Sequence, residues 1–144
     1  MRFFIGLVLL GIVSAIVLPS FLNQANKAKQ NEAKEYIASM NRGQQAYYTK
    51  KAEFSDNISA LGLEFNSETE NYSYDISKVD DGDYVISTAT AKNKQLKSYS
   101  GIVYVDDNTT TLMICETDKP SLTAPEDFES FDICPPGSSK FIKD

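Results

Sequence analysis

The feature that most restricts the fold of this chain is an uncharged run of nineteen residues at positions 3–21, close to the amino terminus. As an α-helix rising about 1.5 Å per residue, the run would extend roughly 28 Å, close to the hydrocarbon thickness of a bilayer. A cleaved secretory signal would have a shorter apolar run before its cleavage site, whereas this run continues well past Ser14 and Ala15. We therefore predict a single-pass membrane helix at residues 1–24 that stays attached to a head at residues 25–144.

Small residues and a proline give the predicted membrane helix two possible uses. Gly6 and Gly11 allow neighbouring helices to approach closely. Pro19 has no N–H to donate to the carbonyl of Ala15, so the helix should kink or loosen there. A kinked anchor is the simpler interpretation, and a helix that packs among copies of itself is the more specific one. The residues that we assign to anchoring and assembly are Phe3, Phe4, Leu7, Gly11, Pro19 and Phe21.

The helical pattern continues beyond the apolar run as an amphipathic stem at residues 25–50. Apolar residues recur on one face at spacings of four, three and seven, flanked by Tyr36 and Gly43, while charged residues occupy the other faces. A stripe of this width more often packs on its own domain than on a partner, so we expect the stem to lie against the head. The members of the stripe are Ala33, Ile37, Met40 and Tyr47.

The charge is unevenly divided along the chain. Residues 22–51 carry six bases and two acids, whereas residues 52–144 carry seven bases and eighteen acids, which with Arg2 gives the net charge of −6. An acidic head favours solubility at a crowded surface and argues against direct nucleic-acid binding by that region. The positive-inside rule places the more basic flank of a membrane helix in the cytoplasm. More bases follow the apolar run than precede it, so this rule, taken alone, would place the head in the cytoplasm and not outside it.

Beyond the stem the sequence predicts a small antiparallel sheet. Residues 51–70 form a connecting loop in which Ser55 or Asp56 caps a short helical turn that ends at Gly62. Four segments with alternating, β-branched or aromatic residues then pair in two hairpins, so we expect a four-stranded meander at residues 71–117 with one face on the stem. The strands are expected at 71–78, 84–91, 99–105 and 110–116, with turns at 80–83 and 106–108.

The only two cysteines, Cys115 and Cys134, suggest an oxidising, extracytoplasmic location for the head. We predict a disulfide between them that closes an irregular, proline-rich region at residues 115–144 and is worth roughly 3 kcal/mol in the chain-entropy model. Two unrelated buried thiols are the alternative. The candidates to pack the closed loop on the sheet are Phe128, Phe131 and Ile133.

The composition argues against catalysis. There is no histidine for a nucleophilic triad or an imidazole metal site, and two cysteines nineteen positions apart are not a CxxC motif. The acidic runs at 80–83 and 106–107 have oxygen ligands that suit calcium, but such residues beside Gly and Asn more often form plain turns, and neither run has EF-hand spacing. We therefore predict a protein that is not an enzyme and has no cofactor or metal.

The amino-terminal third of the chain resembles a known family. The segment SAIVLPSFLNQANKAKQNEAK at 14–34, followed by YIASMNRGQQAYY at 36–48, closely resembles the first helix of type IV pilins and looks most like cyanobacterial pilin-like proteins. The resemblance implies an α+β fold in which the carboxyl half of a long curved helix packs on a four-stranded antiparallel sheet. It also implies that Gly11 and Pro19 bound the stretch that loses helicity in the filament.

The resemblance implies a structural subunit of a type IV pilus or a related filament at the bacterial surface, serving adhesion, twitching motility, DNA uptake or secretion. Before assembly the helix would lie in the inner membrane with the head outside the cytoplasm, and afterwards it would lie in the filament core. The implied partners are other pilin subunits, inner-membrane lipid and the pilus assembly machinery.

Two departures from the family pattern leave alternatives open. The family has a basic leader that ends at a Gly-Phe junction, which does not appear here, and Arg2 stands where the family carries an early glutamate that pairs with a neighbour's amino terminus. Either the true start lies upstream of Met1 and includes a cleavable leader, or the first alternative holds, an unprocessed, membrane-anchored binding or scaffold protein that does not polymerise. The second is a soluble binding domain released by cleavage near residue 20.

Overall fold

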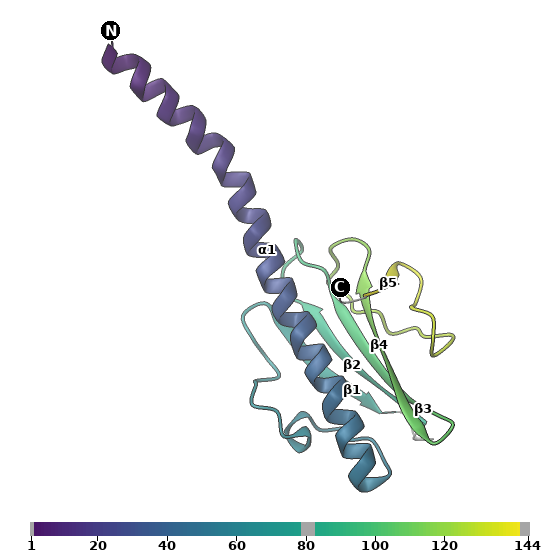
Figure 1. Ribbon diagram of the computed structural model, residues 1–144. Coiled ribbons are helices and arrows are strands. Elements are labelled where there is room, and N and C mark those ends of the chain that lie inside the picture. The colour runs from purple at the N-terminus through teal and green to yellow at the C-terminus, as the bar shows by residue number, and fades with distance from the viewer. Residues whose placement is uncertain (1, 79–82, 142–144) are drawn as a thin grey trace.

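A computed structural model of the chain contains one long helix and one sheet (Figure 1). It describes residues 2–78 and 83–141, and for residues 2–21 it describes the backbone alone. The elements are α1 (Arg2–Lys51), the short 3-10 helix η1 (Ile58–Leu61), and the strands β1 (Tyr72–Lys78), β2 (Tyr84–Ala91), β3 (Tyr99–Asp106), β4 (Thr109–Thr117) and β5 (Ser138–Lys140).

α1 is a single helix of 50 residues, as the continuous helical pattern predicts. The helix continues through Pro19, where we predicted a kink or a loosening, and Figure 1 shows a gradual curve along its length. It ends where Ala52 takes a left-handed conformation (φ 57°) and donates its N–H to the carbonyl of Tyr48. Lys50 and Lys51 in the last turn complement the negative end of the helix dipole.

The predicted membrane helix falls largely on residues whose side chains lie outside the described part of the chain. Among the residues that the structure does describe, no helical stretch is both long and apolar enough to cross a bilayer.

The five strands form one antiparallel sheet in the order β1-β2-β3-β4-β5. The four predicted strands are confirmed, each within one residue at either end. Asp107 and Asn108 both have positive φ and make the two-residue turn between β3 and β4. The other predicted turn, at 80–83, lies mostly outside the described residues, although β1 and β2 pair on either side of it.

The predicted number of strands in the sheet is wrong, because β5 adds a fifth strand beside β4. Its three residues pair with the end of β4, from Cys115↔Lys140 to Thr117↔Ser138. The sequence Ser-Ser-Lys has no apolar alternation, so nothing in it indicates a strand. The strand is placed by its surroundings: Cys134 is bonded to β4, and Gly137, with φ at 82°, turns the chain back along the sheet edge.

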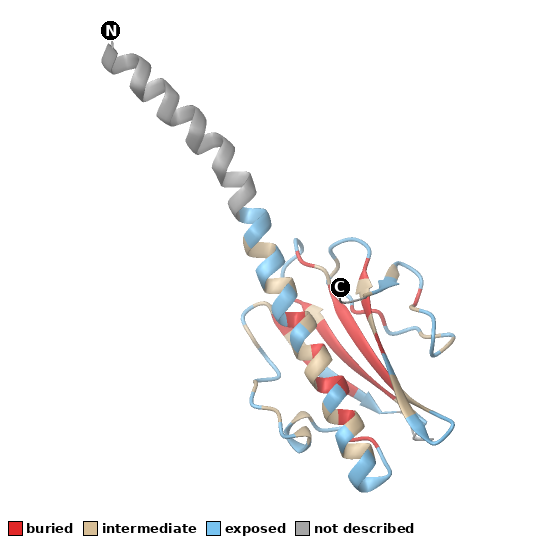
Figure 2. Ribbon diagram, viewed as in Figure 1, coloured by how far each residue is buried: buried red, intermediate tan, exposed pale blue. Residues whose placement is uncertain are grey.

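The carboxyl half of α1 packs on one face of the sheet and forms the main core there (Figure 2). Ala33, Ile37 and Met40 are fully buried, as the apolar stripe predicts, and Tyr47 is half-buried. Every second residue of the strands meets the helix, including Tyr72, Tyr74 and Ile76 of β1, Val85 and Ala89 of β2, and Tyr99 and Val103 of β3.

Two polar residues of α1 are also buried, which the stripe does not predict. The Gln44 side-chain amide donates to the Ser55 carbonyl (2.8 Å) and its oxygen accepts from the Ser55 N–H (2.9 Å), which ties the connecting loop to the helix. Asn41 donates to the Met113 carbonyl across the sheet (3.3 Å). The helix approaches β3 most closely at Gly101, where an added Cβ would lie 2.8 Å from Cγ2 of Ile37.

The connecting loop contains the predicted short helical turn with a different cap. The N-cap of η1 is Asn57, whose side-chain oxygen accepts from the Ser59 N–H (2.8 Å), so the prediction of Ser55 or Asp56 is wrong. Ser55 is instead buried and accepts from the Asn57 N–H (3.0 Å), which sets up the loop before the cap. Gly62 ends the turn as predicted, in a left-handed conformation.

Candidate functional site

The predicted disulfide between Cys115 and Cys134 is confirmed. Cys115 is fully buried on the sheet face that α1 does not cover, together with Ile86, Ile102 and Met113. The bond therefore holds the carboxyl-terminal region against the second face of the sheet. The two faces are covered by different means, one by a helix and the other by a loop attached through a covalent bond.

Two of the three residues proposed to pack this loop on the sheet do so. Phe131 lies 4.8 Å from the ring of Tyr84 and 5.3 Å from that of Tyr104, between ring centroids, and Phe128 packs against the same cluster. Ile133 is 66% exposed, so its predicted packing is wrong.

The carboxyl-terminal loop carries exposed acidic residues at 125–133, a segment that we call the acidic loop. Four of its nine residues are carboxylates and none is basic. All four carboxylates are exposed, and none makes an ion pair with a described residue. Phe131 and Ile133 lie among them, 38% and 66% exposed, so the surface combines negative charge with apolar contact area. The carboxylates are Glu126, Asp127, Glu129 and Asp132.

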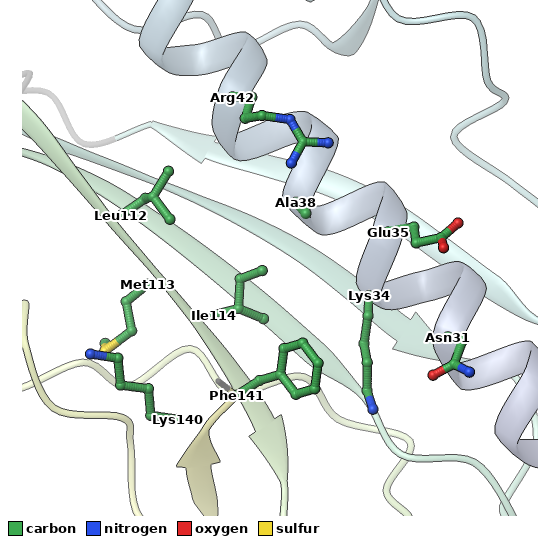
Figure 3. A pocket seen from close by; sticks show the side chains of 10 residues that line it. All are labelled: Asn31, Lys34, Glu35, Ala38, Arg42, Leu112, Met113, Ile114, Lys140 and Phe141. Carbon is green, nitrogen blue, oxygen red and sulfur yellow. The ribbon is translucent and has the colours of Figure 1, made fainter. Parts of the chain in front are cut away.

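A groove lies on the opposite face of the sheet, between α1 and the strands β4 and β5 (Figure 3). It forms because α1 packs chiefly on β3 and β2 and leaves β4 partly uncovered. Leu112 of β4 is consequently 38% exposed, a high value for a large apolar side chain next to the core. We call this cavity, of about 640 Å³, the helix–edge groove; its lining residues are Asn31, Lys34, Glu35, Ala38, Arg42, Leu112, Met113, Ile114, Lys140 and Phe141.

The floor of the groove is apolar and its rim carries charges of both signs. Leu112, Ile114 and Phe141 provide the apolar surface. Arg42 and Glu35 on the helix are exposed at its rim, and neither forms an ion pair among the described residues. Lys140 of β5 pairs in the sheet with Cys115, so its side chain belongs to the sheet face that α1 does not cover.

An ion cluster fixes one end of the groove. Lys34 of α1 and Lys97 of the loop before β3 both contact the Glu116 carboxylate, at 3.1 and 3.5 Å. The Lys34 ammonium also lies 4.4 Å from the centroid of the Phe141 ring, a cation–π contact. These contacts tie the helix to β4 and to the chain after β5, so the groove has a rigid end.

The charges around Glu116 perturb its titration. Burial would raise the pKa of the Glu116 carboxyl, but the neighbouring Tyr99 hydroxyl and the charges of Lys34 and Lys97 outweigh it and lower the pKa below its ordinary value. Burial raises the pKa of Tyr99 well above its ordinary range, so the phenol stays neutral. At neutral pH Glu116 is therefore a carboxylate that the two lysines contact, and Tyr99 is a neutral phenol.

The predicted anchoring and assembly residues can be placed only by their backbone. Phe3, Phe4, Leu7, Gly11, Pro19 and Phe21 all belong to α1, and their side chains lie outside the described residues. Among the described residues, no group of His, Cys, Asp or Glu side chains comes together to hold a metal ion. Of the two acidic runs considered for calcium, 80–82 lies outside the described residues, and Asp107 lies in an exposed turn.

The sequence did not indicate the groove. Leu112 and Met113 are consecutive apolar residues of β4, so they point to opposite faces of the sheet. This is the one sequence signal that apolar contacts form on both faces of β4. The line along which α1 crosses the sheet decides which of those residues stays exposed, and no local pattern encodes that line. Arg42 and Leu112 are 70 positions apart in the sequence (112 − 42) and line the same groove only in the folded chain.

One family of known proteins matches the chain. The model of the type IV pilin-like G and H family matches residues 30–132, which comprise most of the stem, the connecting loop, β1 to β4 and nearly all of the acidic loop. No curated protein and no solved structure shows significant similarity. The matched residues make up more than half of the chain and agree with the resemblance of its first helix. The chain therefore belongs to the type IV pilin-like G and H family.

Proposed function

We propose that the protein is a structural subunit of a type IV pilus or a related filament. In this proposal residues 1–24 anchor the subunit in the inner membrane before assembly and form the filament core afterwards. Residues 25–144 form an extracytoplasmic head that faces outward. The observation that carries the proposal is the single helix Arg2–Lys51, whose carboxyl half is the core of the head while its amino-terminal part extends beyond it (Figure 1).

The length of α1 supports both states of the subunit. At about 1.5 Å per residue, 50 residues extend roughly 75 Å. The first fully buried side chain of the stem is Ala33, and Leu22, Asn23 and Gln24 are exposed, so the helix leaves the head well before its amino terminus. The uncharged run at 3–21 is long enough to span a bilayer, and the same apolar surface would pack against copies of itself in a filament.

The head has the features expected of a unit repeated on a surface. It is acidic, it is closed by a disulfide, and it has a core of its own between α1 and the sheet. Family membership supports a structural role, and the absence of histidine supports a non-enzymatic one. The partners in this proposal are other pilin subunits, inner-membrane lipid and the assembly machinery of the filament.

Shearing of surface filaments from cells tests the proposal. We expect the sheared fraction to contain the protein, and its amino-terminal mass spectrum to show the start site, any leader cleavage and any methylation. Gly11→Asp should abolish the filaments, because a charge at this position is costly both in lipid and in a packed helical core. Gly11→Ala is the matched control, which keeps the position small and uncharged and should still assemble.

The two alternatives give different results. Recovery of the full-length protein solely as a detergent-extracted monomer would overturn the filament proposal and support an anchored scaffold or binding protein. A mature terminus near residue 20 would instead support a released, soluble domain. Membrane levels of the Gly11→Asp variant should be measured in parallel, so that loss of insertion is separated from loss of assembly.

A further inference from the structure

We propose that the end of the head from which α1 emerges binds the anionic headgroups of the membrane in which the subunit is anchored before assembly. This contact rests on the anchor of the proposed function and adds an electrostatic attachment to it. The surface that makes the contact, which we call the basic collar, comprises residues 22–31 of α1 and the loops 92–98 and 118–122.

The basic collar lies at the end of the sheet that faces the anchor. The Lys97 N–H donates to the side-chain oxygen of Gln30 on α1 (3.1 Å), whereas the Gln45 side chain, about four turns further along the helix, donates to the carbonyl of Thr110 (3.3 Å). The sheet therefore runs along α1 with the β2–β3 connection toward the anchor and the β3–β4 turn away from it. Figure 1 shows the loops after β2 and after β4 beside α1, where the helix emerges from the head.

The two loops of the collar are held in place from within the head. Leu96 is fully buried, and its carbonyl accepts from the Ser121 N–H (3.0 Å), which joins the two loops to each other. The Lys92 N–H donates to the carbonyl of Asn71 (2.9 Å), which joins the first loop to the segment before β1. The bases on these loops are therefore carried by a fixed backbone, which lowers the entropic cost of binding.

The basic collar is positively charged in a protein whose net charge is −6. It contains six lysines and one acid, Asp118. With its charged neighbours included, this end of the protein has seven lysines and five acids, whereas the remaining residues of 35–144 carry six bases and fifteen acids. The lysines of the collar are Lys27, Lys29, Lys92, Lys94, Lys97 and Lys119, and its charged neighbours are Lys34 and the acids Glu32, Glu68, Glu70 and Glu116.

Most of the collar's lysines are available to a partner. Two of the six, Lys92 and Lys97, pair with acids on the neighbouring segments. The other four make no ion pair among the described residues, and three of them are exposed to solvent. Leu122, three residues after Lys119 in the same loop, is 46% exposed and adds apolar contact area. Bases around an exposed leucine suit an anionic bilayer, which binds through charge and apolar contact together.

The position of the collar along α1 identifies the membrane as the partner. Lys27 lies six residues beyond Phe21, the last residue of the uncharged run, which is about 9 Å along the helix. The headgroup layer is roughly 5–8 Å thick on each side of a bilayer, so Lys27 reaches its outer boundary. Gln30, where the loop 92–98 contacts the helix, is about 4.5 Å further along. An anchor in the bilayer therefore brings the collar within about one Debye length of the lipid phosphates.

Acetylation of lysine side chains tests the contact in the full-length protein. The protein is inserted in nanodiscs of neutral phosphatidylcholine, or of phosphatidylcholine mixed with anionic phosphatidylglycerol, and mass spectrometry follows the modification of each lysine. We expect Lys94 and Lys119 to react on the order of fivefold more slowly in the anionic nanodiscs. Lys50 and Lys51 are the internal control and should react equally in both, because these exposed lysines lie about 30 Å further along α1 than Gln30.

Equal rates for Lys94 and Lys119 in the two lipids would overturn the inference. An equal slowing at Lys50 and Lys51 would overturn it too, because the effect would then not belong to the collar. Raising the salt from about 0.15 M to about 1 M shortens the Debye length from about 8 Å to about 3 Å, so the slowing should disappear. A slowing that persists in high salt would show that charge does not make the contact.

Charge reversal supplies an independent measurement. In anionic nanodiscs, hydrogen exchange of the two loops should be slower than in neutral ones, and Lys94→Glu with Lys119→Glu should remove this difference. The matched control is Arg42→Glu with Lys50→Glu, two exposed bases of α1 outside the collar that make no ion pair among the described residues. It changes the net charge by the same amount and should keep the difference. Loss of the difference in both variants, or in neither, would contradict the proposed contact.

Co-elution of the protein with the nanodiscs separates this contact from the proposed function. A chain that co-elutes with both kinds of nanodisc but shows no effect of lipid charge overturns the head contact alone. A chain that co-elutes with neither overturns the anchor and the contact together. The filament role is decided separately, by the sheared fraction.

Discussion

The two faces of the sheet are built by different principles. The face under α1 buries a large, continuous set of aliphatic and aromatic side chains, from Ala33, Ile37 and Met40 of the helix to Tyr72 and Tyr99 of the strands. The opposite face buries a much smaller cluster, and the loop above it is attached by a disulfide. The first face is held mainly by the burial of apolar area, and the second mainly by a covalent restraint on a chain with few apolar anchors.

The difference implies that the two faces respond differently to mutation. Damage to the helix face should weaken the whole head, because the helix and β1 to β3 share one core. Damage to the loop face should release the carboxyl-terminal region while much of the remaining structure persists, since local stability follows the local density of buried contacts.

Ile37→Ala should give the largest effect. Ile37 is fully buried where α1 crosses β3, and truncation of a buried isoleucine costs about 2–5 kcal/mol of unfolding free energy. The measurement is urea denaturation of the purified full chain in mild detergent, followed by the near-ultraviolet circular dichroism of its tyrosines. Ile37→Val, which removes one methyl group, should cost about 0.5–1.5 kcal/mol. Equal losses for the two variants would show that the site is not closely packed.

Removal of the disulfide by Cys115→Ala with Cys134→Ala should cost about 3 kcal/mol of unfolding free energy. In contrast to Ile37→Ala, it should loosen one part of the head and not the whole. Hydrogen exchange should show lost protection in β5 and the acidic loop, whereas α1 and β1 to β3 keep most of theirs. The reason is that the core under α1 consists of residues of α1, the connecting loop, the strands β1 to β4 and Leu96, and none of its members lies in the carboxyl-terminal region. A uniform loss of protection across the sheet would contradict the contrast between the faces.

The same contrast explains which parts of the fold the sequence predicted. The stem and the four main strands were predicted because their buried residues repeat with the period of a helix or a strand, as in Ala33, Ile37 and Met40. β5 was missed because Ser-Ser-Lys carries no such period and is placed by a bond and a turn. The groove was missed for a related reason, since Leu112 is exposed only because of where α1 crosses the sheet.

That crossing depends on Gly101, which gives the third prediction. An added Cβ would lie 2.8 Å from Cγ2 of Ile37 and closer still to the side-chain oxygen of Asn41, so the helix would have to shift. Overpacking of this kind costs about 1–3 kcal/mol, so Gly101→Ala should be destabilised by that amount in the same urea measurement.

The matched control is Ser100→Ala, next to Gly101 on the opposite face. The buried Ser100 hydroxyl has no partner among the described residues, and its removal should be close to neutral. Similar losses at both positions would show that β3 is equally tight on its two faces.

The smallest expected effect is a change of stability with pH, and it tests the ion cluster of Lys34, Lys97 and Glu116. The pKa of Glu116 is lowered in the folded head, against the effect of burial, by its neighbours Tyr99, Lys34 and Lys97. A carboxyl with a lowered folded pKa stabilises the fold above its unfolded pKa, here about 4.5, and that contribution is lost as the pH falls through the lower, folded value.

Glu116→Gln removes the charge at every pH. The wild-type chain should therefore be more stable than the variant near neutral pH, by less than about 1 kcal/mol for a partly exposed pair, and the difference should shrink as the pH falls below about 4.5. Urea denaturation of both chains from pH 7 to pH 3 measures this difference and cancels the contributions of the other carboxylates. Since Lys34 and Phe141 form one end of the groove, the variant should also loosen the chain after β5. A difference that stays constant over this range would show that Glu116 supports the helix face through packing alone, without its charge.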